Sequence, residues 1–206
     1  DVTVSTQLVR LRNKGANWTV DNTLGNGPVL IRKGLRSLGV LSQDINDTSP
    51  GKIHHATNCW GMDAASVRVG GAELMSGMVG VRPFASYAET DVPGIQLAKE
   101  WLDKKNRGKA IKNGSYLLKW AKMYLATQIL CTLVDEKGWE GVTGENFLHK
   151  LLNTKHFNSL GICDVTYSPD YPMLQRCKIY MVQKNGDLLP ASDYYDLPDL
   201  RPAKYR

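Results

Sequence analysis

The stretch Trp18-Thr19-Val20-Asp21-Asn22-Thr23-Leu24-Gly25-Asn26-Gly27-Pro28 decides the fold class, because the pattern changes within it from strand to helix. Residues 18–20 are typical of a short buried strand. The loop over 22–27 is rich in residues that tolerate positive φ, and Pro28 stands where a first helical residue is favoured. Gly39 ends the helix that follows, and Gly15 ends a helical pattern over 4–14. This helix, strand, loop and helix predict half of a parallel α/β layer.

The rest of the chain continues the alternation of strands and helices. Strand patterns cover 52–57, 78–81, 178–183 and 188–192, and Asn185-Gly186 between the last two is a strong hairpin signal. Helical patterns cover 63–69, 93–106, 115–136 and 143–153. The helix over 115–136 has a wide apolar surface, which predicts burial on more than one side.

Composition excludes several classes of protein. The 206 residues are 42% hydrophobic and 22% charged, so the chain can bury a core and is not a disordered tail. No apolar run approaches the roughly 20 residues that a membrane span needs. The net charge is +6, but the densest basic stretch, at 104–112, contains no aromatic residue that could stack on a base. We therefore expect a solvated helix end there and no nucleic-acid partner.

The cysteines and histidines indicate neither a metal site nor a cofactor. The four cysteines show no CxxC spacing, and His54 and His55 are adjacent, so on a strand they point to opposite faces. Cys163 and Cys177 flank a predicted turn and could face each other across two strands. A disulfide between them stays open, because its geometry cannot be read from sequence.

No catalytic motif is present, which favours a binding protein over an enzyme. The loop over 24–28 lacks the third glycine of the dinucleotide fingerprint and the Lys-Ser/Thr pair of a P-loop, so a tight strand-to-helix turn is expected there. There is no Gly-x-Ser-x-Gly elbow, and no pair of carboxylates is marked out for acid–base chemistry. A nucleotide-dependent enzyme that uses the 25–28 turn remains as an alternative.

Several segments, in this order and spacing, resemble the later half of the substrate-binding proteins of branched-chain amino acid ABC transporters, the type I periplasmic binding proteins. The resemblance covers 7–39, 71–84, 93–136 and 160–193. The matching runs are QLVRL at 7–11, GANW at 15–18, LGNGP at 24–28, AE at 72–73, GMVGV at 77–81, PF at 83–84, TYSP at 166–169 and KIYMVQKNG at 178–186.

The resemblance implies a partial type I periplasmic-binding-protein fold, an α/β three-layer αβα arrangement with a mostly parallel sheet. Family members are about twice as long and have two lobes joined by three crossovers, with the ligand between them. Residues 1–108 would form a second-lobe segment, 109–175 a helical first-lobe segment, and 176–206 a C-terminal hairpin and tail returning to the second lobe. Residues 40–57 depart from the family, which has a short apolar strand there.

Ligand contacts in this fold come from loops at the carboxyl ends of strands. The resemblance implies seven contacts: Asn22, Thr23, Leu24, Asn58, Trp60, Asp63 and Tyr116. Trp60 stands where amino-acid binders place an acid for the ligand ammonium, and Asp63 is the nearest carboxylate. We therefore expect Trp60 to face the cleft and allow an aromatic or aliphatic acid as ligand. The alternative is structural: the asparagines cap helices, Trp60 fills the core and Tyr116 only packs.

The implied function is that of an extracytoplasmic receptor, periplasmic or extracellular and lipid-anchored in some members, whose leader has been removed. It would bind a small amino acid or carboxylate, deliver it to a membrane permease, catalyse no reaction and need no cofactor or metal. The alternative is a cytoplasmic ligand sensor on the same fold, and a disulfide between Cys163 and Cys177 would favour the receptor because the cytosol is reducing. The missing N-terminal half of the receptor is expected as a partner. Without it, the helices over 115–136 and 143–153 are expected to self-associate through Leu118, Leu125, Ile129 and their neighbours.

Overall fold

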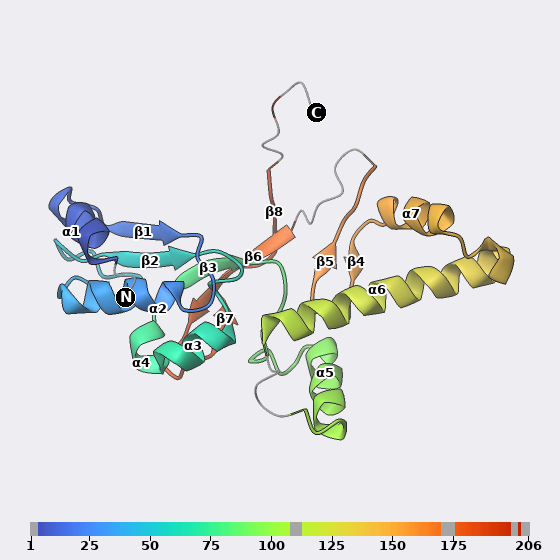
Figure 1. Cartoon of the computed structure of the whole chain (residues 1–206), viewed down its shortest axis with the longest axis horizontal. Coiled ribbons are helices and arrows are strands. Elements are labelled where there is room, and N and C mark those ends of the chain that lie inside the picture. Colours follow the sequence, from blue (N-terminus) through green and yellow to red (C-terminus); the bar gives the residue numbers. More distant parts are fainter. Residues whose placement is uncertain (1–3, 108–112, 170–175, 199–201, 203–206) are drawn as a thin grey trace. The chain divides into compact units, whose positions relative to one another are not determined.

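The computed structural model describes residues 4–107, 113–169, 176–198 and 202, and it divides the chain into two compact units. Unit 1 comprises Asp1–Arg82 and Lys178–Asp193, and unit 2 comprises Pro83–Cys177 and Tyr194–Arg206. In Figure 1 the colours follow the sequence, so the residues of each unit can be located with the bar. Residues 83–108 thus group with unit 2, whereas the sequence analysis placed them with 1–82. The assignment of these segments to the lobes of a binding protein remains a prediction.

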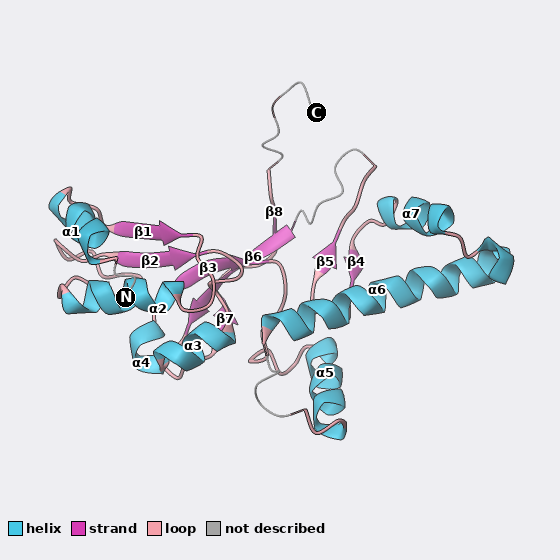
Figure 2. Cartoon of the chain, viewed as in Figure 1, coloured by secondary structure: helices cyan, strands magenta, loops and turns pink. Residues whose placement is uncertain are grey.

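Unit 1 is built on a mixed sheet whose first strands are parallel (Figure 2). Its order is β1 (Trp18–Asp21), β2 (His54–Thr57), β3 (Val79–Arg82), β6 (Arg176–Val182) and β7 (Leu188–Pro190). β1, β2 and β3 run parallel, β6 runs antiparallel to β3, and β7 returns antiparallel after the predicted hairpin. β8 (Tyr195–Asp196) pairs with the first residues of β6. The α/β class agrees with the sequence analysis, and β1, β2 and β3 form the parallel part of this mixed sheet.

Helices cover one face of this sheet. They are α1 (Ser5–Asn13), α2 (Gly27–Ser37), α3 (Ala64–Gly70) and α4 (Ala72–Met75), and Figure 1 shows α2, α3 and α4 on the same side of the strands. Pro28 lies in the first turn of α2, where its missing N–H costs no hydrogen bond. α1 adds Leu8 to a core cluster that contains Leu35 and Ile53. The face beneath the helices is therefore the core of unit 1.

The opposite face of the sheet is apolar but poorly covered. Among the side chains that strand register places on this face are six apolar ones, which we call the open face: Val20, Ala56, Val79, Val81, Ile179 and Met181. Val20 is 77% exposed and Ile179 40%, and the other four are half-buried. Parallel strands are normally buried on both faces. The described residues therefore leave the open face without the cover that this kind of sheet requires.

Unit 2 is organised around one long helix. Its elements are α5 (Pro93–Lys104), α6 (Gly114–Lys137), the 3₁₀ turn η2 (Trp139–Gly141), α7 (Gly144–Leu152) and the strand pair β4 (Phe157–Asn158) and β5 (Asp164–Val165). Asn113 begins α6 by accepting the Tyr116 N–H at 3.0 Å, and Thr143 begins α7 by accepting the Asn146 N–H at 3.2 Å. These two caps stand where the sequence analysis began the helices. β4, β5 and β8 were not predicted, because two residues are too few to show alternation.

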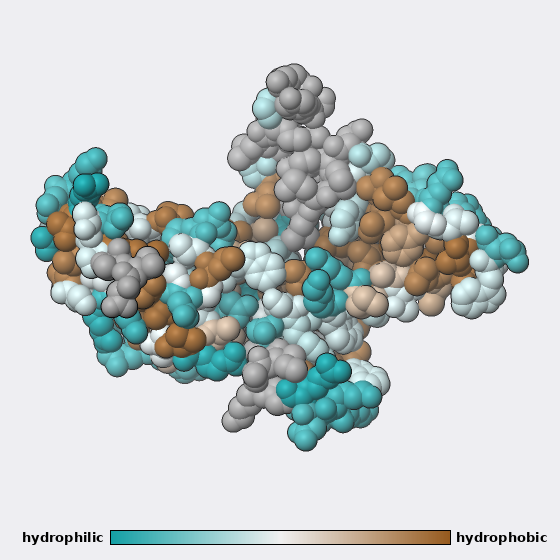
Figure 3. Space-filling view, in the orientation of Figure 1, coloured by the Kyte–Doolittle hydropathy of each residue, from teal (hydrophilic) through white to brown (hydrophobic). Residues whose placement is uncertain are grey.

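α6 buries one face and exposes the other. The buried side chains recur every four residues: Leu117, Ala121, Leu125, Ile129 and Leu133. The expectation that Leu125 and Ile129 form an outward surface is therefore wrong, because both are packed within unit 2 and Leu118 is half-buried. The outward face instead presents Met123 and Leu130, which are 66% and 40% exposed. Figure 3 shows apolar side chains gathered in the region of α6 and α7.

Cys163 and Cys177 are both buried free thiols, so the disulfide left open by the sequence is not formed. In the part of the chain that is described, no helix has both the length and the apolar composition needed to cross a bilayer.

We predict that Gly80→Ala destabilises unit 1, because β2 and β3 approach closely there. A Cβ at Gly80 would lie 2.5 Å from the Thr57 carbonyl oxygen and 3.2 Å from the Met62 Cβ. We expect a loss of about 1–3 kcal/mol in the free energy of unfolding, measured by urea denaturation. Gly144→Ala is the matched control, because its Cβ would meet nothing within 4 Å. Equal unfolding midpoints for the two variants would contradict the predicted crowding.

Candidate functional site

The carboxylate of Asp21 ties the carboxyl ends of β1 and β2 to the loop that follows β1. Asp21 accepts hydrogen bonds from the backbone N–H of Thr23 at 2.7 Å, from the Thr23 hydroxyl, and from the Thr57 hydroxyl at 3.2 Å. His55 Nε2 lies 2.5 Å from the same carboxylate. One buried side chain, which is 6% exposed, therefore fixes both strand ends and the turn that begins the loop.

Burial and hydrogen bonding set the charges of the Asp21–His55 pair. His55 is 0% exposed, and burial lowers its pKa below the usual 6.5 despite the opposing effect of Asp21. Burial raises the pKa of Asp21, but hydrogen bonds from His55 and Thr23 outweigh it and hold that pKa below 3.8. At neutral pH the pair is therefore a carboxylate that accepts a hydrogen bond from a neutral imidazole.

Further hydrogen bonds hold the two candidate loops in place. Asn58 Nδ2 donates to Asn22 Oδ1, which joins the loop after β2 to the loop after β1. The Ser66 hydroxyl, on α3, donates to the Gly25 carbonyl at 2.8 Å. Gly61 lets the loop after β2 pack closely against Thr57, because a Cβ at position 61 would lie 2.1 Å from the Thr57 hydroxyl oxygen. The loops are thus preorganised before any solute arrives.

The predicted contacts of unit 1 differ in accessibility. Asn22 and Leu24 are exposed, with Leu24 65% exposed, while Thr23 and Asn58 are half-buried. Trp60 is 42% exposed, so it is not sealed in the core. The two asparagines bond to each other rather than capping a helix.

Asp63 and Tyr116 stand in different surroundings. Asp63 is buried and caps α3 by accepting the Ala65 N–H at 2.8 Å, which engages its carboxylate structurally. Tyr116 lies in the first turn of α6 in unit 2, where it is half-buried. The structure therefore brings together the unit 1 candidates, and Tyr116 belongs to the other unit.

The sequence analysis missed the role of Asp21 and His55. The signal for Asp21 was present, because an aspartate with a threonine two residues later is typical of an Asx turn. The partnership with His55 depends on the register Asp21↔Thr57 and Thr19↔His55, which no local pattern reveals.

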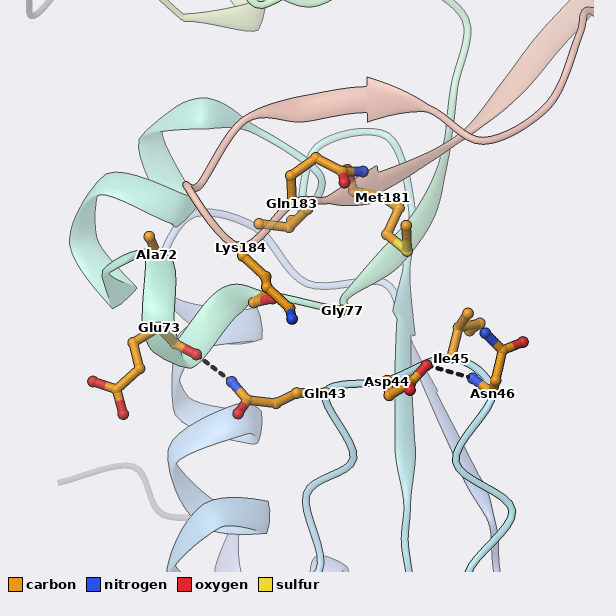
Figure 4. Close-up of a pocket in the computed structure, with 12 residues that line it drawn as sticks. Gln43, Asp44, Ile45, Asn46, Ala72, Glu73, Gly77, Met181, Gln183 and Lys184 are labelled. Carbon is orange, nitrogen blue, oxygen red and sulfur yellow. Dashed lines mark hydrogen bonds between the residues drawn. The ribbon is translucent and has the colours of Figure 1, made fainter.

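A cavity of about 810 Å³ lies at the opposite end of the sheet from these loops (Figure 4). Its walls come from the loop over 43–46, from 72–77 and from 181–184, at the start of β3 and the end of β6. Gln43 donates to the Glu73 carbonyl and the Asn46 N–H to Asp44, which shapes the lower wall. Asp44 and Lys184 give the walls opposite charges, so electrostatics favours no single class of ligand here.

The described residues contain no group of three histidine, cysteine, aspartate or glutamate side chains that could hold a metal ion. The predicted independence from metals and cofactors remains a prediction.

The chain has the fold of about half of a type I periplasmic binding protein. It is similar to an ABC transporter substrate-binding protein from Aeropyrum pernix, with a TM-score of 0.71 and 18% identity over 98% of this chain and 50% of that one. A branched-chain amino acid ABC transporter protein from Thermus thermophilus with bound valine gives a TM-score of 0.72 at 16% identity, with the same coverage. A periplasmic ligand-binding protein of a branched-chain amino acid ABC transporter from Burkholderia xenovorans gives a TM-score of 0.66 at 16% identity, over 93% of this chain and 47% of that one.

The chain therefore spans about half the length of the solved structures that it matches. At these identities the likeness establishes the fold, and the activity has to be argued from the site. No protein-family model matches the sequence, and no curated protein sequence matches it significantly.

We predict that the stability of the protein falls as the pH is lowered from 7 to 5, because of His55. The folded pKa of His55 is lowered, so the unfolded chain takes up a proton first as the pH falls through 6.5. The free energy of unfolding then decreases until the folded protein also binds the proton. The effect of Asp21 lies at lower pH, because its stabilisation is lost only as the pH falls below 3.8.

The matched test is urea unfolding of His55→Gln, whose amide can still donate to Asp21. This variant should show a flatter dependence of stability on pH between 7 and 5. His149→Gln, which alters an exposed histidine, is expected to leave the wild-type slope unchanged. An equal slope in the wild type and in His55→Gln would contradict the assignment.

Proposed function

We propose that the chain is the C-terminal half of an extracytoplasmic solute receptor of an ABC importer. It would bind a small amino acid or carboxylate and deliver it to a membrane permease. The observation that carries the proposal is the fold, which substrate-binding proteins share over 92–98% of this chain. The tied loops at the carboxyl ends of β1 and β2 support it, because ligands of α/β sheets bind at that edge.

The accessible side chains of these loops suit a solute with both polar and apolar parts. The Asn22 amide is exposed and offers hydrogen-bond donors, and Leu24 and Trp60 offer apolar surface. The amide oxygen of Asn58 is buried, so Asn58 offers a solute only its Nδ2, which also donates to Asn22. Asp63, the acid considered for a ligand ammonium, is buried and capping α3. This chemistry favours a solute recognised through its carboxylate and its apolar body.

The same geometry favours binding over catalysis. The titratable pair at this edge, Asp21 and His55, is engaged internally, and His55 is fully buried. A general base has to come within hydrogen-bond reach of its substrate. A buried imidazole that supports two strands is therefore better suited to fixing the loops than to proton transfer.

The alternative is a cytoplasmic ligand sensor on the same fold. The free thiols of Cys163 and Cys177 are consistent with this alternative, since a reducing cytosol would keep them reduced.

We further propose that a polypeptide supplying the first lobe covers two faces that this chain leaves bare. One is the open face of unit 1, and the other is the outward face of α6 around Met123 and Leu130. The matched structures contain about as much polypeptide again as this chain. A sheet supplied by that polypeptide would bury apolar area that is now exposed. Each Å² buried would add ~25 cal/mol to the stability of the assembly.

We predict that Asn58→Ala weakens solute binding about tenfold, the cost of one hydrogen bond to a charged ligand group. The measurement is a thermal-shift screen of amino acids and carboxylates on the chain assembled with its first-lobe polypeptide, followed by calorimetric titration. Asn46→Ala, which alters an exposed asparagine at the other end of the sheet, should bind normally. The proposed function fails if no amino acid or carboxylate raises the melting temperature of the assembled receptor.

We predict that the isolated chain self-associates as its concentration rises, because the two apolar faces are bare. The apparent mass from light scattering should grow with concentration, and Val20→Glu with Met123→Glu should suppress this growth. Gln128→Glu adds the same charge to α6 without removing an apolar group. This variant should show the same growth in apparent mass as the wild type. A stable monomer would contradict the prediction, and a discrete dimer that buries Met123 would assign the face to a second copy.

A further inference from the structure

A small recess opens in unit 2 between the end of α5 and the start of α6. Its volume is about 310 Å³, and five residues line it: Trp101, Lys105, Arg107, Tyr116 and Trp120. Three of the side chains are aromatic and two are cationic, and none is acidic. A volume of this size holds a ligand with one ring.

The charges of the recess favour an anion. Lys104, the neighbour of Lys105, is paired with Glu100 at 2.6 Å. Lys105 and Arg107 have no carboxylate partner among the described residues, and the Lys105 ammonium lies 5.9 Å from the centre of the Trp101 ring. Two cations at the rim of an apolar recess are suited to charge-assisted hydrogen bonds with a carboxylate.

The aromatic walls are held in place by their own contacts. The Trp120 ring stacks on Tyr124 with centroids 5.8 Å apart, and Tyr124 in turn contacts Phe157 at 5.9 Å. Tyr116 is fixed at the first turn of α6 by the Asn113 cap. Rings that are already ordered lose little entropy on binding, and they stack on a flat ligand better than on a branched aliphatic one.

This arrangement adds a feature that the sequence analysis did not predict. The basic stretch at 104–112 contains no aromatic residue, yet folding brings Trp101, Tyr116 and Trp120 beside its first cations. A single-stranded nucleic acid would need a groove that follows several nucleotides. A recess of about 310 Å³ offers one position, so a small ligand fits it better.

We infer that this recess binds an aromatic carboxylate, with the ring against Trp101, Tyr116 and Trp120 and the carboxylate on Lys105 and Arg107. The inference rests on the proposed function, because Tyr116 is one of the proposed solute contacts, and it names the solute class. It agrees with unit 1, where Trp60 is accessible and Asp63 is engaged as a cap.

The test follows tryptophan fluorescence in a Trp18→Phe, Trp60→Phe, Trp139→Phe background, which retains only Trp101 and Trp120. The probes are benzoate, the uncharged benzamide, the aliphatic isobutyrate and a short oligothymidylate, each titrated at micromolar protein. We expect benzoate to quench the fluorescence saturably and to bind about tenfold more tightly than benzamide or isobutyrate, the factor for one charge-assisted contact. Lys105→Met with Arg107→Met should weaken benzoate binding by at least that factor.

Lys119→Met with Lys122→Met is the matched control, because it removes the same charge from exposed positions of α6 outside the recess. Equal binding of benzoate and benzamide, or an equal effect of both double variants, would overturn the inference. Tighter binding of the oligothymidylate would also overturn it and assign the recess to nucleic acid.

The two proposals fail in different ways. If the assembled receptor takes up an aliphatic solute while benzoate leaves Trp101 and Trp120 unquenched, the inference fails and the proposed function stands. If benzoate quenches them in the isolated chain but no solute, benzoate included, stabilises the assembled receptor, the recess stands in the isolated chain and the proposed function fails.

Discussion

The carboxylate of Asp21 is the point on which the candidate site of unit 1 depends. It receives hydrogen bonds from Thr23, His55 and Thr57, and so joins two parallel strands to the loop that carries Asn22 and Leu24. The cost of removing this carboxylate from water is offset by those hydrogen bonds, and burial keeps the His55 imidazole neutral. The loops are thus held by a carboxylate that is already engaged, which leaves the exposed side chains of Asn22 and Leu24 to a solute.

A second constraint is the need of apolar faces for cover. A parallel sheet is stable when both faces are buried, and the open face around Val20, Val79 and Ile179 has no such cover in the described part of unit 1. α6 shows the same imbalance, since it buries Leu125 and Ile129 while exposing Met123 and Leu130. Both units thus expose apolar side chains in the part of the chain that is described. Exposed apolar faces of this kind are expected of a chain whose fold matches about half of larger proteins.

Much of the fold could be predicted from the sequence, because its signals are local. Pro28 and Gly39 delimit α2, Asn185-Gly186 gives the hairpin, and a strand pattern precedes the loop at 22–27. The features that the sequence analysis did not predict correctly depend on contacts between residues far apart in the sequence. The direction in which α6 turns its leucines depends on α7 and on the residues near β4, so the choice of Leu125 and Ile129 as outward residues was wrong. The pairing of Asp21 with His55 depends on strand register, which hydrophobic periodicity does not specify.

The candidate site was predictable only where residue type and loop position were enough. Asn22, Asn58 and Trp60 were proposed because they follow strands, and their contact with a solute stays a prediction; Asn22 and Trp60 are exposed and Asn58 is half-buried. The aromatic recess could not be found, because Trp101 and Trp120 reach Lys105 only through the packing of α5 against α6. The two sites share one chemical bias. Neither the loops after β1 and β2 nor the lining of the recess includes an accessible, unengaged carboxylate, and each includes tryptophan beside hydrogen-bond donors. The physical chemistry of both sites therefore favours an apolar acid over a zwitterion.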